Sequence, residues 1–305
     1  MTPDTYTIAE SFLDVGDGHR LYIHEWGKAK AKMPILFLHG GPGSQVKDKH
    51  KGIFDPAKQR VIFFDQRGAG KSLPYGSLEH NTTQDLISDI EKIADHFSLK
   101  QFVITGGSWG SCLAFAYTLT HPKRVAALVL HGVFSGSKAE IEWLDKGRFQ
   151  TFFPDVWQRY LDSTPQTHRY NPSRYHFDRI LGNNEAAQRE SGYIYENLEG
   201  SVMALDDRFE PEDPETYDPA GIRIEVHYMQ HGCFLPDEYI LKNAHKLATP
   251  VWLIQGRYDV VCPPITAWRL NQILANSHLI WSINGHKAEH ESWNLQRTIL
   301  AQWSD

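Results

Sequence analysis

The sequence predicts an α/β protein in which a mostly parallel central sheet carries helices on both faces and is interrupted by a helical insertion. Short apolar runs alternate with helical patterns through residues 35–130, which is typical of parallel strands buried on both faces. From residue 134 to 245 these runs give way to aromatic-rich helical segments broken by prolines, and strand-like runs resume at 251–254 and 278–283. The expected division is residues 1–133 for the first part of the core, 134–245 for a helical cap domain, and 246–305 for the second part of the core.

The first strands lie in the N-terminal part of the chain. Partly alternating apolar residues flank Gly16-Asp17-Gly18 within residues 12–27, a pattern that predicts a β-hairpin. Residues 35–38 and 61–64 are short apolar runs, each ending at glycine-rich or polar sequence, and we expect both to be buried strands.

Alternation between helix and strand then continues. Residues 82–97 carry apolar residues on one helical face, with one of the two leading threonines as the expected N-cap. A third buried strand is expected at 102–105, a helix at 111–120, and a fourth strand at 125–130.

Composition narrows the class of protein. The chain has 305 residues, of which 41% are hydrophobic and 22% charged, and its net charge is −6. Because both signs of charge are interspersed, we expect neither nucleic acid nor an anionic membrane as the main partner. No apolar run approaches the roughly 20 residues that span a bilayer.

The expected location is the cytoplasm. The first residues contain neither the basic segment nor the apolar segment of a secretory signal. Three widely spaced cysteines, Cys112, Cys233 and Cys262, indicate reduced thiols rather than a disulfide framework.

Ser108 is the strongest catalytic candidate. It lies in Gly106-Gly107-Ser108-Trp109-Gly110, between a predicted strand and a predicted helix, which is the context of the G-x-S-x-G nucleophile elbow of the α/β-hydrolase fold. A sharp turn there lifts the hydroxyl off the sheet, and the helix N-terminus favours developing negative charge. The alternative is a glycine-rich turn with a capping serine, but the flanking elements favour a nucleophile.

A serine nucleophile requires a base and an acid, which follow in the order Ser, acid, His in this fold. Asp259 comes just after the predicted strand at 251–254, and His286 comes just after the one at 278–283. Both therefore lie at the carboxyl ends of strands, where α/β sheets place ligands. His290 is the rival base, but His286 is favoured because it comes first after the strand and follows a glycine.

Two backbone N–H groups are expected to form the oxyanion hole. One belongs to Trp109, the residue after the nucleophile, and the other to the loop His39-Gly40-Gly41-Pro42-Gly43. We assign the second donor to Gly41, because glycine allows the backbone to approach a substrate closely.

Two other motifs are rejected. Gly70-Lys71-Ser72 resembles the end of a phosphate-binding loop, but Asp65 stands where that motif requires a glycine. The segment from His286 to His290 matches the H-x-x-E-H pattern of some zinc peptidases, but it follows a strand and a glycine rather than lying within a helix. We expect no metal.

Taken together, these blocks make the sequence resemble the proline iminopeptidases, serine peptidases of the α/β-hydrolase fold. The resemblance covers nearly the whole chain and rests on the following segments: 39–43, 64–72, 81–83, 106–111, 256–263 and 285–286. It implies Ser108, Asp259 and His286 as the catalytic triad and release of N-terminal proline from short peptides. It also implies that no cofactor or metal is needed.

The resemblance further implies two substrate-binding glutamates in the cap. Glu199 lies in Leu198-Glu199-Gly200, and Glu225 lies in Ile224-Glu225-Val226-His227-Tyr228. A proline N-terminus at neutral pH is a secondary ammonium with two N–H donors, so two carboxylates can accept one each. The alternative is that both are surface charges. Phe134 matches an aromatic position near the proline ring, with simple core packing as its alternative.

Three positions depart from the family pattern. Leu198 replaces a tryptophan, His131 replaces an arginine, and Lys287 replaces a serine. Because these differences surround the substrate end of the site, the second hypothesis is an esterase or amidase of broader small-molecule specificity. A non-catalytic binding protein on the same fold is the third hypothesis, and the intact triad disfavours it.

Overall fold

The computed structural model describes residues 4–205, 213–288 and 290–304, and in them eight strands form one sheet. The strand order is β1-β2-β4-β3-β5-β6-β7-β8; β1 pairs antiparallel with β2 and β2 with β4, whereas all other pairs are parallel. The predicted α/β fold with a mostly parallel sheet is therefore confirmed. The strands are β1 Thr7–Gly16, β2 His19–Gly27, β3 Ile35–Leu38, β4 Arg60–Phe64, β5 Phe102–Ser108, β6 Val125–Val133, β7 Val251–Gly256 and β8 Ser277–Ser282.

The predicted hairpin is present but starts earlier than expected. Asp17 and Gly18 both have positive φ in the turn between β1 and β2, as the sequence indicated. Strand β1 begins at Thr7 rather than at Phe12. Its residues Ile8 to Phe12 are exposed at the sheet edge, so no alternation of buried and exposed residues marks them in the sequence.

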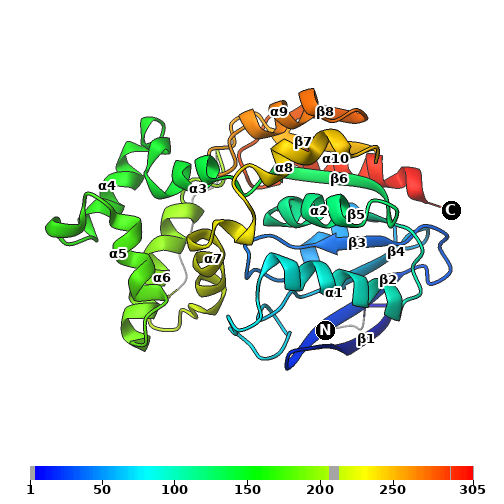
Figure 1. The fold of residues 1–305 in the computed structure, drawn as a ribbon, viewed down its shortest axis with the longest axis horizontal. Helices are drawn as coiled ribbons and strands as arrows, with labels where there is room; N and C mark the ends of the chain where they lie inside the picture. The colour runs from blue at the N-terminus through cyan, green and yellow to red at the C-terminus, as the bar shows by residue number, and fades with distance from the viewer. Residues whose placement is uncertain (1–3, 206–212, 289, 305) are drawn as a thin grey trace.

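Alternate residues of the central strands point to opposite faces of the sheet. Leu36, Ile104 and Leu128 pack into the core cluster that includes residues of the helices α1, α2 and α9. Phe37 and Val103 face the other cluster, which includes residues of α10. Helices thus cover both faces (Figure 1), which explains why the strands read as continuous apolar runs. These helices are α1 Thr83–His96, α2 Trp109–Thr120, α9 Ile265–Ile273 and α10 His290–Leu300.

Thr82 is the N-cap of α1. Its Oγ1 accepts a hydrogen bond from the backbone N–H of Asp85, and the Asp85 carboxylate accepts one from the backbone N–H of Thr82. This reciprocal capping box satisfies two helix-end donors and sets the start of the helix.

A long helical excursion separates β6 from β7, which are neighbouring parallel strands. The chain leaves the sheet at the carboxyl end of β6, the same edge at which β5 ends in Ser108. Helices α3 to α7 gather at one end of the sheet (Figure 1, green to yellow), and the short helix α8 returns the chain to contact α2 and α9. The helices are α3 Lys138–Asp145, α4 Pro154–Asp162, α5 Pro172–Ile180, α6 Glu185–Gly200, α7 Ala220–Gln230 and α8 Tyr239–Asn243.

The remaining regular elements are short 3-10 helices in connecting segments: Asp48–Ile53, Arg148–Thr151, Gln166–His168, Gly232–Phe234, Ala244–Lys246 and Ala301–Trp303. Within the described ranges, none of the helices combines the length and the apolar character that crossing a membrane would need.

Candidate active site

Ser108 occupies a strained turn between β5 and α2. Its φ is 56° and its ψ is −127°, a backbone conformation that non-glycine residues adopt rarely. A Cβ atom at Gly106 or at Gly110 would overlap the carbonyl oxygen of Leu38, and one at Gly107 would overlap the imidazole of His131. The glycines are therefore required by close packing against β3 and β6, and helix α2 starts directly after Ser108.

His286 and Asp259 are hydrogen-bonded to each other. The Nδ1 atom of His286 lies 2.9 Å from Oδ2 of Asp259, and the side chains are 8% and 0% exposed. Burial lowers the pKa of His286, but attraction to the Asp259 carboxylate and the hydrogen bond to it outweigh burial and raise the pKa above its ordinary value.

The Asp259 carboxylate is held by three donors. Oδ1 accepts from the backbone N–H groups of Val261 and Cys262, at 3.0 and 2.8 Å. Oδ2 also accepts from Nε2 of Gln255, at 3.0 Å. Gln255 is the penultimate residue of the otherwise apolar strand β7 and in turn accepts from the backbone N–H of Val133. Sequence reasoning did not single out Gln255, although a polar residue at the end of a buried strand is a usable signal.

Gly132 places His286 beside Ser108. With a φ of +49°, a Cβ at this position would lie 3.0 Å from Cε1 of His286 and 3.7 Å from the backbone nitrogen of Ser108. The imidazole of His286 and the backbone of Ser108 therefore both lie close to the same residue of β6, Gly132. Helix α10 begins at His290, the rival base, whose side chain is outside the described part of the chain.

The glycine-rich loop after β3 passes beside the serine. A Cβ at Gly40 would lie 3.4 Å from Cβ of Ser108 and 4.0 Å from its Oγ. Gly41 has a φ of +106°, and a side chain there would strike the backbone nitrogens of Gly43 and Ser44, so only glycine fits. Trp109, the other expected oxyanion donor, is fully buried at the first turn of α2.

A pocket connects the serine to the inserted helices. Its lining includes the predicted residues Gly41, Ser108, Phe134, Glu199 and Glu225. Val261 and Cys262, which follow Asp259 closely in the sequence, also line the pocket. No sequence motif marks the other lining residues, which are Glu140, Ile141, Leu144, Asp145, Tyr195 and Met229. A wider cleft, open to solvent, adjoins it and shares Gly41, Ser108, Glu199 and Glu225.

Glu199 on α6 and Glu225 on α7 face each other in this pocket. Both side chains line the pocket, and their carboxyl groups interact with each other. Burial and the neighbouring Glu199 charge raise the pKa of Glu225 well above its usual range, and burial also raises the pKa of Glu199. Glu225 is only 7% exposed and Glu199 is half-buried, so neither is an ordinary surface charge.

Asp145 is a further acidic residue of the same pocket. Its Oδ1 accepts a hydrogen bond from the hydroxyl of Tyr195 at 3.1 Å, and burial raises the pKa of Asp145 to about 7. It comes from helix α3, where the sequence contains no motif that marks it.

The three residues that differ from the family pattern, His131, Leu198 and Lys287, lie in different surroundings. His131 lies against Gly107, and burial together with the charge of His286 lowers the pKa of His131 to about 4. Leu198 is 3% exposed and packs in the core. The backbone N–H of Lys287 donates to the carbonyl of Met203. Among the described residues, no group of three or more His, Cys, Asp or Glu side chains is arranged to hold a metal ion.

Comparison with known proteins agrees with this geometry. A family profile described as alpha/beta hydrolase fold matches residues 33–288. The chain is 38% identical over 276 residues to a probable proline iminopeptidase of Leptolyngbya boryana, covering 88% of this chain and 85% of that protein. It is 37% identical over 306 residues to a proline iminopeptidase of Xylella fastidiosa strain Temecula1, covering 98% and 97%.

Solved structures share the fold at lower identity. An esterase from Exiguobacterium antarcticum superposes with a TM-score of 0.67 at 19% identity, covering 97% of this chain and 99% of that chain. At this identity the structural similarity supports the fold alone. The sequence identity to the two proline iminopeptidases, by contrast, extends over 85% and 97% of those proteins. The chain therefore belongs to the proline iminopeptidase family of α/β-hydrolase-fold enzymes.

Proposed function

We propose that this enzyme releases N-terminal proline from short peptides by acyl-enzyme catalysis, with Ser108, His286 and Asp259 as its triad. The observation that carries the proposal is that Glu199 and Glu225 line the same pocket as Ser108. A pocket that joins a serine nucleophile to two buried carboxyl groups suits a substrate with a cationic amine beside its scissile carbonyl.

The catalytic steps follow from the assigned positions. Oγ of Ser108 attacks the carbonyl carbon of the first residue while Nε2 of His286 takes the hydroxyl proton. Asp259 keeps the proton of His286 on Nδ1 and stabilises the imidazolium that forms. The backbone N–H groups of Gly41 and Trp109 hold the oxyanion. His286 then protonates the leaving amine, the C–N bond breaks, and water hydrolyses the acyl-enzyme by the same route.

Recognition of the amino end uses the carboxyl pair. A secondary ammonium presents two N–H donors, one for each of Glu199 and Glu225, and both hydrogen bonds are charge-assisted. A substrate with an acylated amine brings no positive charge, so it leaves buried carboxylates unpaired, which is costly. This accounts for an exopeptidase rather than an endopeptidase.

The pocket and the wider cleft bind different parts of the substrate in this proposal. The pocket that contains Phe134 takes the proline ring, and the wider cleft lined by Lys47, Tyr75 and Tyr217 takes the leaving part of the peptide. Residues 134–245 act as the cap over the serine and restrict the substrate to short peptides.

A substrate panel tests the proposal. We expect rapid hydrolysis of proline p-nitroanilide, slow hydrolysis of alanine p-nitroanilide, and none of N-acetylproline p-nitroanilide. Rapid hydrolysis of p-nitrophenyl acetate without any preference for a free amine would indicate the broader esterase or amidase instead. Folded protein that fails to react with a fluorophosphonate probe would indicate a non-catalytic binding protein.

We further propose a cytoplasmic location. Its support is that Cys112, Cys233 and Cys262 are all buried free thiols, as is usual in reducing compartments. Fractionation of the source cells should recover the proline p-nitroanilide activity in the cytosolic fraction, and activity confined to the extracellular fraction would contradict this.

A further inference from the structure

Gln66 is a buried polar residue that the catalytic steps above do not use. It follows strand β4, is 2% exposed, and makes three hydrogen bonds to two separate segments. Its backbone N–H donates to Nε2 of His39 and its side-chain Nε2 donates to the carbonyl of His39, both at 2.9 Å. Its Oε1 accepts from Nε1 of Trp109 at 2.8 Å.

These two segments supply the proposed oxyanion donors. His39 directly precedes Gly40 and Gly41, and Trp109 supplies the second N–H group from the first turn of α2. A single side-chain amide therefore bridges the glycine-rich loop and the nucleophile turn. Its two ends are not interchangeable, because the NH₂ group must face a carbonyl and the oxygen must face the indole N–H.

The protonation of His39 agrees with this arrangement. Since Nε2 of His39 accepts the Gln66 N–H, the ring proton must lie on Nδ1, which is 2.9 Å from the carbonyl of Gly40. Burial lowers the pKa of His39, so the ring stays neutral and can keep accepting. His39 thus links Gln66 to the loop both through its carbonyl and through its ring.

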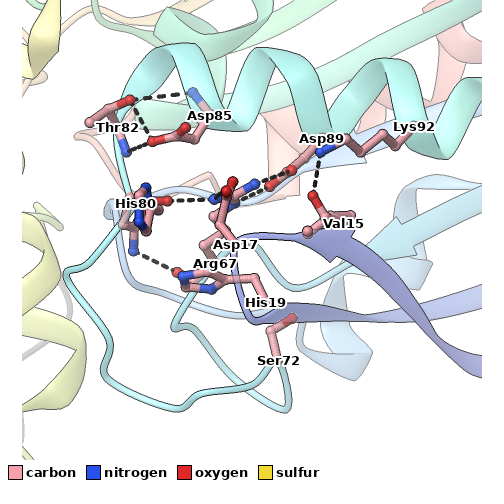
Figure 2. Close-up of polar contacts among 12 residues, drawn as sticks. Val15, Asp17, His19, Arg67, Ser72, His80, Thr82, Asp85, Asp89 and Lys92 are labelled. Atoms are coloured by element: carbon pink, nitrogen blue, oxygen red, sulfur yellow. Dashed lines mark hydrogen bonds and ion pairs between the residues drawn. The ribbon is translucent and has the colours of Figure 1, made fainter.

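The residues on both sides of Gln66 are held by hydrogen bonds and an ion pair. The next residue, Arg67, forms a bidentate ion pair with Asp89 of α1, at 2.7 and 2.8 Å, and also donates to the carbonyl of His80 (Figure 2). Before it, the carboxylate of Asp65 accepts from the backbone N–H groups of Val46 and Lys71. The backbone around Gln66 is therefore fixed on both sides.

We propose that Gln66 is a positioning residue for the oxyanion hole, because it holds the Gly41 loop and Trp109 at the separation at which both amides reach the oxyanion. The inference rests on the proposed function, since it assumes that these two amides act on the tetrahedral intermediate. Oxyanion donors must lie about 2.7–3.1 Å from the oxyanion. A misplacement of about 1 Å can cost about 100-fold in rate.

The central test is Gln66→Met, which keeps much of the side-chain volume and removes both polar ends. With proline p-nitroanilide we expect kcat to fall by about 10- to 100-fold and KM to change less than about threefold, because the oxyanion hole acts on the transition state. Affinity for a prolylboronic acid, whose adduct with serine is tetrahedral, should fall by the same factor as kcat/KM. Inhibition by free proline should stay unchanged.

Gln59→Met is the matched control. Gln59 is 1% exposed and also bridges two segments, because it donates to the carbonyl of Leu300 at 2.7 Å and accepts from the N–H of Asp55 at 2.8 Å. Gln59 lines neither the pocket nor the cleft that contains Ser108. This variant should lose stability and keep kcat within about twofold, which would separate a positioning role from general loss of packing.

Trp109→Phe provides a second route in case Gln66→Met does not fold. It removes the indole N–H that binds Gln66 together with part of a buried ring, and it should give a smaller loss that is confined to kcat, whereas the lost packing lowers stability. An unchanged kcat in a folded variant, or a loss confined to KM, would overturn the inference. Measuring both variants on p-nitrophenyl acetate as well separates the proposals, because the oxyanion hole acts on esters even if the preference for proline is absent.

Discussion

The imidazole of His286 and the carboxylate of Asp259 meet at 2.9 Å although 27 positions separate them in the chain. Strands β7 and β8 are adjacent and parallel, and their last residues Gly256 and Ser282 are in register. The loops that follow them therefore emerge side by side at the carboxyl edge of the sheet. Three donors already fix the Asp259 carboxylate, so the orientation of the imidazole is set before substrate arrives.

Asp259→Asn should lower kcat by about 10⁴-fold, because an amide favours the wrong tautomer of His286. In the wild type Asp259 raises the pKa of His286, and kcat/KM should rise with pH as His286 loses its proton. Removing that charge should move the acid limb of the residual activity to lower pH. The measurement is a pH–rate profile of both proteins, and an unmoved acid limb would count against the pairing.

Ser108→Ala should abolish turnover and fluorophosphonate labelling while the circular dichroism spectrum stays that of the wild type. The reason is that residual catalysis without a nucleophile comes only from binding and the oxyanion hole. Ser163→Ala is a suitable control, since Ser163 lines neither the pocket nor the cleft that contains Ser108. Turnover by a clean Ser108→Ala preparation at the wild-type rate would exclude this residue as the nucleophile.

Glu225→Gln should raise KM for proline p-nitroanilide by about 10- to 100-fold, since a hydrogen bond to a charged group contributes about 1.5–3 kcal/mol. The same change should stabilise the free enzyme at pH 8. The pKa of Glu225 is raised on folding, so its contribution to stability is present at low pH and is lost as pH rises.

Thermal unfolding across pH measures this second effect. The increase in Tm over the wild type should be larger at pH 8 than at pH 4. Glu215→Gln, which changes an exposed carboxylate, should leave Tm and KM unchanged. A Tm gain that is equal at both pH values would show that burial of the charge is not its cause.

Asp145→Asn should also stabilise the enzyme at alkaline pH. Folding raises the pKa of Asp145 to about 7, so the wild type loses stability between its unfolded pKa of about 4 and pH 7, at up to about 1.4 kcal/mol per pH unit. An asparagine can still accept the hydrogen bond from Tyr195. Urea unfolding at pH 5 and pH 8 should show the advantage of the variant mainly at pH 8.

Arg67→Met should destabilise the protein by about 3–5 kcal/mol, because it leaves the fully buried Asp89 carboxylate without its partner. Figure 2 shows that Arg67 also joins Asp17 and the carbonyl of His80 to this pair. The double variant with Asp89→Leu should recover much of the lost stability in urea unfolding. No recovery would mean that the bonds to His80 and Asp17, rather than the ion pair, carry the effect.

The sequence predicted the strands most accurately where burial is two-sided. Residues 35–38 match β3 in full, and 251–254 fall within β7. Strand β5, however, continues past Thr105 through two glycines to Ser108. Glycines normally weaken a strand, but here β3 and β6 pair with it on both sides. Helix α2 likewise starts at Trp109 rather than at Ser111, directly at the turn.

The amino-acid sequence by itself determined the fold class, the order of serine, aspartate and histidine, and the family, because these depend on local patterns and short motifs. Only the tertiary structure decided that Glu199 and Glu225 line one pocket, that Asp145 faces the same pocket, and that Gln66 bridges His39 to Trp109. Those relationships join segments 26 to 80 positions apart along the chain. Their energies depend on burial and on the partner's position, and no local pattern of residues encodes either.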